Sequence, residues 1–273
     1  MSNTSLTFIG GGNMARSLIA GLIADDHEPA AIRVVEPDAA KCEQLRRHFG
    51  VTASADTQAM LQGARVVVLS VKPQVAAGVC RALAPLLPAS APLVISVMAG
   101  VTNVSIQHWL GRSVPLVRAM PNTPALVQSG AIGLYANAQA SEEERNLAEE
   151  ILRAAGLTQW VESEADIDAV TALSGSGPAY FLLLMEAMEQ AGIRQGLDAE
   201  TARLLTIQTA LGSARLAMES DESPAELRAR VTSPGGTTER AIACFDEGGF
   251  SGLVDQAIAA ARARAAELSA ELS

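Results

Sequence analysis

The residues best suited to chemistry lie in a short loop late in the chain, Thr232 to Glu239, which reads Thr-Ser-Pro-Gly-Gly-Thr-Thr-Glu. Its two glycines allow backbone conformations that other residues avoid, and its proline stiffens the approach. Apolar residues at helical spacing follow, so we expect a helix capped by Thr237 or Thr238. Unpaired N–H groups at a helix start attract a carboxylate or phosphate, although an ordinary capped helix has the same sequence.

A second candidate site lies near the N-terminus, where the pattern G-x-G-x-x-A runs from Gly10 to Ala15. The apolar run Leu6 to Ile9 predicts a strand before it, and apolar residues at helical spacing predict a helix after it. A glycine run between a strand and a helix is the context in which dinucleotides bind. Gly10 would permit the tight turn, Gly12 the close approach of the pyrophosphate, and Ala15 close helix packing.

An acidic residue ends the next predicted strand, Ile32 to Glu36, about 20 residues after the glycine run. Glu36 can accept hydrogen bonds from the adenosine ribose hydroxyls and would repel a 2′-phosphate, which favours NAD over NADP. Arg33 and Lys41 could instead hold such a phosphate. A solvated residue at a strand end would give the same sequence.

Three further apolar runs predict buried parallel strands: Val66 to Val71, Leu93 to Val97 and Val114 to Arg118. The carboxyl ends of parallel strands share one edge of a sheet, where cofactors lie. The candidate cofactor contacts are therefore residues after these runs, with two from the glycine run: Asn13, Met14, Val71, Lys72, Pro73, Ala99 and Asn122. A solvated lysine and a structural proline-flanked turn are alternative interpretations for Lys72 and Asn122.

Strand and helix signals alternate through the first half of the chain and end with a strand at Leu157 to Val161. This pattern predicts an α/β fold, a Rossmann-type doubly wound sheet domain over residues 1–163. Residues 164–273 have almost no strand signal and predict an all-α dimerisation domain. Its expected helices are Ala179 to Gln190, Ala199 to Met218, Ala225 to Arg230, Thr238 to Phe245 and Leu253 to Leu268.

The first long helix of the second half has an unusual composition. Pro178 suits a first helical position, which predicts a second helix start after small residues. Phe181 to Met185 is apolar on all sides, so this helix must be buried all round, more than a small helical domain can manage alone. We therefore expect a helix-swapped dimer.

Composition narrows the classes of function. Hydrophobic residues make up 49% of the 273 residues, as in a well-buried protein, and the net charge of −10 disfavours nucleic acids and acidic membranes as partners. Cys42, Cys80 and Cys244 are widely separated and indicate buried thiols, with neither a disulfide framework nor a metal site. We find no leader pattern in Met1 to Thr7 and no run that could span a bilayer, which predicts a cytoplasmic protein.

These motifs together resemble those of one known family. Its signature residues in this sequence are Phe8 to Ala15, Val71 to Pro73, Met120 to Pro124, Asp168 to Tyr180 and Val231 to Thr238. They closely resemble pyrroline-5-carboxylate reductase, the last enzyme of proline synthesis. The resemblance implies NADPH as cofactor, with NADH possible, and a small-molecule substrate. It also implies a helical domain that forms dimers, which often assemble into decamers.

The resemblance also implies roles for the late loop. Thr238 would hydrogen-bond the ring nitrogen of the substrate, while Ser233 and the amides of Gly236 and Thr237 would hold its carboxylate. The sequence departs from the family at Ala229, where many members have an aspartate, and at Glu36, which disagrees with the common preference for NADPH.

The available side chains favour reduction of an imine. The second half contains no histidine and no lysine, one of which a dehydrogenase acting on a hydroxyl would normally use as proton carrier. A cyclic imine can bind already protonated, so the enzyme needs mainly to position it. Tyr180 could serve as a proton donor or pack against a helix. The alternatives are a β-hydroxyacid dehydrogenase-like oxidoreductase and a non-enzymatic dinucleotide sensor.

Overall fold

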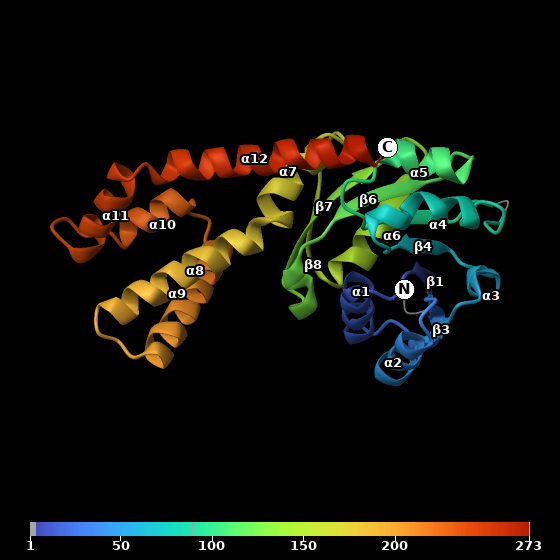
Figure 1. The fold of residues 1–273 in the computed structure, drawn as a ribbon, viewed down its shortest axis with the longest axis horizontal. Helices are drawn as coiled ribbons and strands as arrows, with labels where there is room; N and C mark the ends of the chain where they lie inside the picture. The colour runs from blue at the N-terminus through green and yellow to red at the C-terminus, as the bar shows by residue number, and fades with distance from the viewer. Residues whose placement is uncertain (1–3, 89, 273) are drawn as a thin grey trace. The chain divides into compact units, whose positions relative to one another are not determined.

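The computed structural model describes residues 4–88 and 90–272, so the segment Met1 to Thr7, where no leader pattern was found, is described only from Thr4. The chain divides into two compact units (Figure 1). The first runs to Ser176 and takes up the chain again from Ala260; the second is Gly177–Ala259. The boundary expected at residue 163 stays a prediction about folding domains.

A single mixed sheet forms the centre of the first unit. Its strands are β1 (Leu6–Ile9), β2 (Ile32–Val35), β3 (Thr52–Ser54), β4 (Val66–Leu69), β5 (Leu93–Ser96), β6 (Leu116–Met120), β7 (Gly130–Ala136) and β8 (Gly156–Trp160). Their spatial order is β3-β2-β1-β4-β5-β6-β7-β8. The chain leaves β1 toward β2 on one side and returns to β4 on the other, which creates the topological switch point of a doubly wound fold.

The strands expected from long apolar runs are confirmed, because β1, β4 and β5 are buried along their whole length. Two strands were missed. β3 is only three residues long, and β7 is rich in glycine and alanine. The parallel pattern also needs a correction, since β6 and β7 pair antiparallel while the remaining neighbours are parallel.

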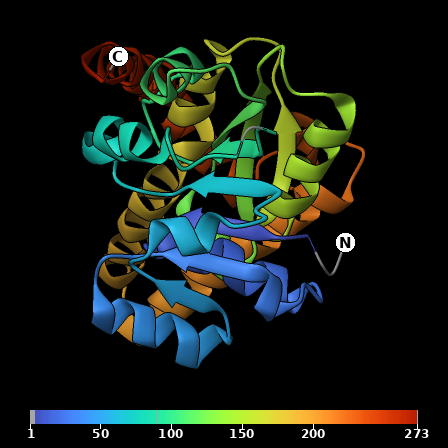
Figure 2. The ribbon, with the colours of Figure 1, turned by 90° about the vertical axis from the view of Figure 1, so that its right-hand side faces the viewer.

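Helices cover both faces of the sheet (Figure 2). Side chains of α1 (Asn13–Ala24), α2 (Ala39–Phe49) and α6 (Glu142–Arg153) share one buried cluster with the strands. Those of α3 (Thr57–Leu61), α4 (Ala76–Leu83) and α5 (Asn103–Leu110) share a second cluster on the opposite face. This coverage explains why the central strands have no polar face.

The end of α12 (Phe250–Glu271) also belongs to the first unit, from Ala260 on. Leu272 packs against the second cluster, and a Cβ added at Gly100 would lie 3.2 Å from its Cδ1 atom. The final turns of this helix therefore lie over the loop that follows β5, although the sequence predicts them as part of the helical domain.

The second unit is helical, as expected. It contains α8 (Gly177–Arg194), α9 (Ala199–Glu219), α10 (Pro224–Arg230), α11 (Thr237–Glu247) and the start of α12 (Phe250–Glu271). Each of the five predicted helices is present, and each is longer than its predicted range by one or more residues at one or both ends. Ser223 forms a capping box with Glu226 at the start of α10.

The helix start expected at Pro178 is confirmed to within one residue, because α8 begins at Gly177. Helical structure begins with α7 at Asp166–Val170 and passes through a π-helical turn at Thr171–Gly175 before α8. The small residues of this stretch usually predict a break, so the helical backbone before Gly177 was not expected. By length and composition the resulting stretch, Asp166–Arg194, could cross a membrane, which corrects the expectation that no such run exists.

The second unit buries little of its apolar surface. Of its residues, all of which the structure describes, the buried hydrophobic ones are Ala202 and Leu227. Phe181, Leu182 and Leu183 on α8 are 67%, 63% and 66% exposed. Patches of this kind mark protein or membrane contact surfaces. The helix that is apolar on all sides is therefore not covered within its own unit.

Candidate dinucleotide and substrate sites

The glycine loop begins where β1 ends and lies against the end of β4. Gly10 has φ +102°, and a Cβ there would meet the Ser70 carbonyl oxygen at 2.8 Å. The Ser70 hydroxyl donates to the carbonyls of Ile9 and Gly10, at 3.1 and 2.9 Å. Side-chain and backbone contacts therefore fix the tight turn that the sequence predicts at Gly10.

The opposite side of this loop is open. Gly12 is exposed and is the N-cap of α1, where no side chain caps the helix. A Cβ added at Gly12 would meet no protein atom within 4 Å. The free N–H groups of α1 and the helix dipole thus face an accessible space, which suits a pyrophosphate. Asn13 is exposed and Met14 half-buried beside it.

Glu36 lies directly behind the glycine loop and is only 7% exposed. Its Oε2 accepts from the Gly11 N–H at 3.0 Å and its Oε1 from the Asp38 N–H at 3.1 Å. The interpretation of Glu36 as a solvated strand-end residue is therefore wrong, because both oxygens satisfy backbone donors at the end of β2.

The remaining strand ends present accessible residues along the same edge. After β4, Lys72 is exposed while Val71 and Pro73 are half-buried, and Pro73 begins a short 3-10 helix (Pro73–Val75). Ala99, after β5, is also exposed. These residues follow neighbouring parallel strands, so their positions agree with a cofactor edge. Their contacts with a cofactor stay predictions.

The Asn122 side chain, after β6, forms two hydrogen bonds to the backbone. It is 8% exposed, its Nδ2 donates to the Ser174 carbonyl at 2.9 Å, and its Oδ1 accepts from the Ala131 N–H at 3.0 Å. This amide therefore joins β7 to the π-helical turn. The proline-flanked turn supplies the rigid placement that the sequence suggested, and a cofactor contact by Asn122 stays a prediction.

The late loop enters α11 differently from our expectation. The N-cap is Gly236, with φ −83° and ψ 172°, and no side chain caps the helix. The proposed Thr237 or Thr238 cap is thus wrong, because Gly236 already supplies the extended backbone and the threonines fall inside the first turn. Neither threonine hydroxyl is used in capping, which leaves them available to a ligand.

Two contacts shape this loop. The Gly236 N–H donates to the Ser233 carbonyl at 3.0 Å, which closes a turn around Gly235, with φ +71°. The Gly235 N–H donates to the Glu239 carboxylate at 2.8 Å. Ser233 and Thr237 are exposed and Thr238 is half-buried. Glu239 was expected in the loop, but its bond to Gly235 was not; its place in the first helical turn suits an acid.

Metal clusters and cavities are further places where a ligand could bind. In the described chain no group of three or more His, Cys, Asp or Glu could hold a metal. A cavity of about 280 Å³ is bordered by Leu22, His27 and Glu150 and contains none of the predicted site residues. Burial lowers the pKa of His27, whose Nε2 lies 3.1 Å from the Thr4 carbonyl. This ring therefore joins the loop after α1 to the segment before β1.

Comparison with protein families identifies two regions. Residues 164–268 match the family described as pyrroline-5-carboxylate reductase dimerisation. Residues 5–100 match the family described as NADP oxidoreductase, coenzyme F420-dependent. The first match covers the helical part of the chain, and the second includes the glycine loop and Glu36.

Relatives extend along the whole chain. The pyrroline-5-carboxylate reductase of Pseudomonas aeruginosa is 51% identical over 272 residues, covering 100% of this chain and 99% of the relative. The structure of the Coxiella burnetii enzyme of that name has a TM-score of 0.95 at 48% identity, covering 98% and 99% of the two chains. The Plasmodium falciparum pyrroline carboxylate reductase, solved with NADP bound, has a TM-score of 0.86 at 27% identity, with coverage of 98% and 99%.

Proposed function

The chain belongs to the pyrroline-5-carboxylate reductase family, and from this we infer that it reduces 1-pyrroline-5-carboxylate to L-proline with NAD(P)H. This is the final step of proline biosynthesis. The full-length similarity at 51% identity carries the inference. The glycine loop and the Thr232–Glu239 loop support it independently, because they supply the dinucleotide and anion sites that the reaction needs.

The residues present fit a nicotinamide dinucleotide. Gly12 leaves open the space that a Cβ would fill, at the uncapped start of α1. We propose that Gly10, Gly12, Asn13 and Met14 hold the pyrophosphate and that Glu36 lies beside the adenosine ribose. Val71, Lys72, Pro73, Ala99 and Asn122 complete the proposed cofactor edge. When bound, the reduced nicotinamide supplies a hydride.

The late loop is the proposed substrate site. Ser233 and the amides of Gly236 and Thr237 hold the substrate carboxylate, and Thr238 orients the ring nitrogen. Reduction takes place at the imine carbon, which is C2 of the pyrroline ring and becomes C5 of proline. The π electrons of the C=N bond move to nitrogen, and the protonated iminium becomes the neutral secondary amine of the ring. The iminium arrives with its proton, so the second half needs no histidine or lysine for the step.

Glu239 should position this loop, because its carboxylate accepts the Gly235 N–H. Replacing it with alanine is expected to raise KM for the imino acid about 3- to 10-fold, with KM for NAD(P)H unchanged. Glu239→Gln keeps an acceptor oxygen and is the matched control, which should stay near wild type. Steady-state kinetics with each substrate varied separately measure both constants. Equal KM values for Glu239→Ala and wild type would contradict this role.

Self-association is supported by the dimerisation family match and by the exposed apolar face of α8. We propose that a second copy covers Phe181 to Leu183 and that residues 164–273 form the dimerisation domain. Further assembly to a decamer and a cytoplasmic location are part of the same proposal. Sedimentation of the purified protein would report the number of copies, and a monomer at micromolar concentration would contradict the dimer.

The decisive assay follows the absorbance of NADH or NADPH while 1-pyrroline-5-carboxylate is added to folded protein. We expect oxidation that depends on the imine. The hydroxyacid dehydrogenase alternative predicts reduction of NAD(P)⁺ by a β-hydroxyacid instead, and the sensor alternative predicts binding without turnover. Tyr180 as a proton donor is tested in the same assay, since Tyr180→Phe should leave the rate near wild type if the iminium arrives protonated.

A further inference from the structure

We propose that Glu36 and Asp38 make this chain select NADH over NADPH. The proposal rests on the function above only in that NAD(P)H is the cofactor. The end of β2 and the start of α2 lie beside the glycine loop, where the adenosine ribose of a bound dinucleotide belongs. The 2′ position of that ribose would therefore meet these two acids.

Glu36 is fixed in place by four contacts. Its side chain accepts from Gly11 N–H and Asp38 N–H, as described above. Its own N–H donates to the Ser54 carbonyl at 3.1 Å, and its carbonyl accepts from the Cys42 thiol at 3.1 Å. A carboxylate held at both ends cannot swing away from an approaching phosphate. Its remaining lone pairs suit two ribose hydroxyls.

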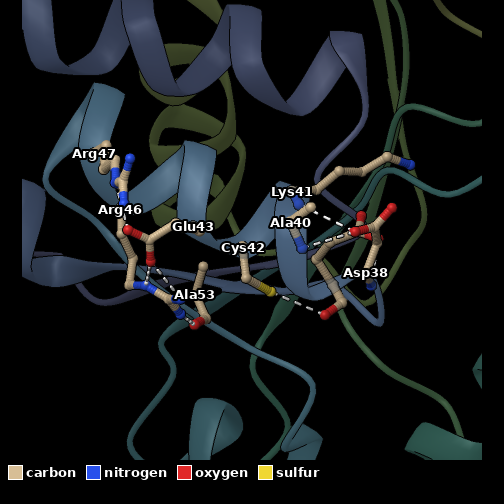
Figure 3. Close-up of polar contacts among 9 residues, drawn as sticks. Asp38, Ala40, Lys41, Cys42, Glu43, Arg46, Arg47 and Ala53 are labelled. Carbon is tan, nitrogen blue, oxygen red and sulfur yellow. Dashed lines mark hydrogen bonds and ion pairs between the residues drawn. The ribbon is translucent and has the colours of Figure 1, made fainter.

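Asp38 occupies the other possible phosphate site. It is the N-cap of α2, and its Oδ1 accepts from the N–H groups of Ala40 and Lys41 at 2.8 and 3.2 Å (Figure 3). A helix N-terminus would otherwise attract a phosphate. Here the protein's own carboxylate satisfies the first amides and adds a second negative charge.

The arginines of this region are directed elsewhere. Arg46 donates to the Ala53 carbonyl at 2.7 Å and pairs with Glu43, which also pairs with Arg47 (Figure 3). Arg33, considered above as a phosphate ligand, donates to the Met60 and Gln62 carbonyls. Arg33, Arg46 and Arg47 therefore each already bind carbonyl or carboxylate oxygens of the protein.

Two other cations lie at α2. Arg16 donates to Gln44 Oε1 at 3.4 Å and lies over the Phe49 ring, while Lys41, in the first turn of the helix, is exposed. A single mobile ammonium in water offsets little of the repulsion from two carboxylates, one of them buried. We expect the Kd for NADPH to exceed that for NADH by about 100-fold at low ionic strength.

Binding measurements without substrate test this selection separately from the reaction. Titration of the full-length protein with NADH and with NADPH, followed by nicotinamide fluorescence, gives the two Kd values. Competition by 5′-AMP and by 2′,5′-ADP isolates the 2′-phosphate, the one group by which they differ. NADH selection without imine turnover would leave this inference intact and overturn the proposed function. Equal or tighter binding of NADPH would overturn the inference.

Three variants assign the effect to residues. Asp38→Ser keeps a capping oxygen and removes one charge, so the preference for NADH should fall several-fold with unchanged thermal stability. Glu36→Gln keeps the size of the side chain and one acceptor oxygen, and it should reduce the preference for NADH by about 10-fold or more. Lys41→Ala should leave NADH binding unchanged.

Two results would contradict the assignment even if wild type selects NADH. One is an unchanged Kd ratio in both folded acid variants. The other is a Lys41→Ala variant whose Kd for NADPH rises by as much as the two acids are proposed to raise it. Asp38→Ser decides the question alone if Glu36→Gln does not fold, because Asp38 is exposed and its cap is retained.

Discussion

Replacing Thr238 with alanine is expected to lower turnover of the imino acid about 10- to 100-fold while the Kd for NAD(P)H stays near its wild-type value. Thr238 lies in the first turn of α11, and its hydroxyl is not used to cap the helix. Removing the hydroxyl takes away the group proposed to orient the ring nitrogen. Cofactor binding should not change, because the glycine loop belongs to the other unit.

Thr238→Ser is the matched control, since it keeps the hydroxyl and loses only a methyl group. It should retain most of the wild-type turnover. Single-turnover kinetics at saturating cofactor separate the chemical step from binding and release. Full activity of Thr238→Ala, or equal losses in the alanine and serine variants, would remove Thr238 from the mechanism.

Replacing Gly12 with alanine should weaken NAD(P)H binding without weakening the fold. A Cβ at Gly12 meets no protein atom within 4 Å, and the backbone φ of −72° suits alanine. The methyl group would occupy the space proposed for the pyrophosphate. Such overpacking costs about 1–3 kcal/mol, which raises Kd roughly 5- to 150-fold.

Gly10→Ala is the contrasting variant. With φ +102° and the Ser70 carbonyl oxygen 2.8 Å from the added Cβ, it should lose both stability and cofactor binding. The expected loss of stability is about 2–4 kcal/mol. Thermal melts and cofactor titrations of both variants check the pair. Unchanged Kd for the folded Gly12→Ala protein would show that the dinucleotide lies elsewhere.

Much of the first unit follows from its apolar runs. Strands such as β4 and β5 are covered on both faces, so their residues are continuously hydrophobic and easy to recognise. β7 differs because Gly130 and Gly133 interrupt it, and glycine is a poor indicator of strands. Its antiparallel pairing with β6 depends on contacts between distant parts of the chain, which the local sequence does not specify.

A candidate site residue could be predicted where its backbone conformation allows only one residue type. Gly10 is such a case, because the left-handed turn excludes other residues. Glu36 could be located from its spacing, but its bonds to Gly11 and Asp38 depend on how the loop folds back onto β2. The Thr237 or Thr238 cap failed for a related reason, since Gly236 can end the extended segment without a side-chain oxygen.

The need for a partner was visible from the sequence because the segment Phe181 to Met185 of α8 is apolar on all sides. The structure adds that its central residues stay exposed within their own unit. What the sequence could not reveal is that the helix continues back through the π-helical turn to Asp166. Glycine and serine residues usually predict breaks, while here they form the turn that joins two helices.

The most direct test of the central claim traces the hydride. The protein is incubated with 1-pyrroline-5-carboxylate and NADH or NADPH carrying deuterium at C4 of the nicotinamide, and the product is analysed by mass spectrometry and NMR. We predict proline with one deuterium at C5, formed in equal amount to the cofactor oxidised. Proline without deuterium at C5 from either C4 face of the cofactor, or cofactor oxidation without proline, would contradict the proposed reduction.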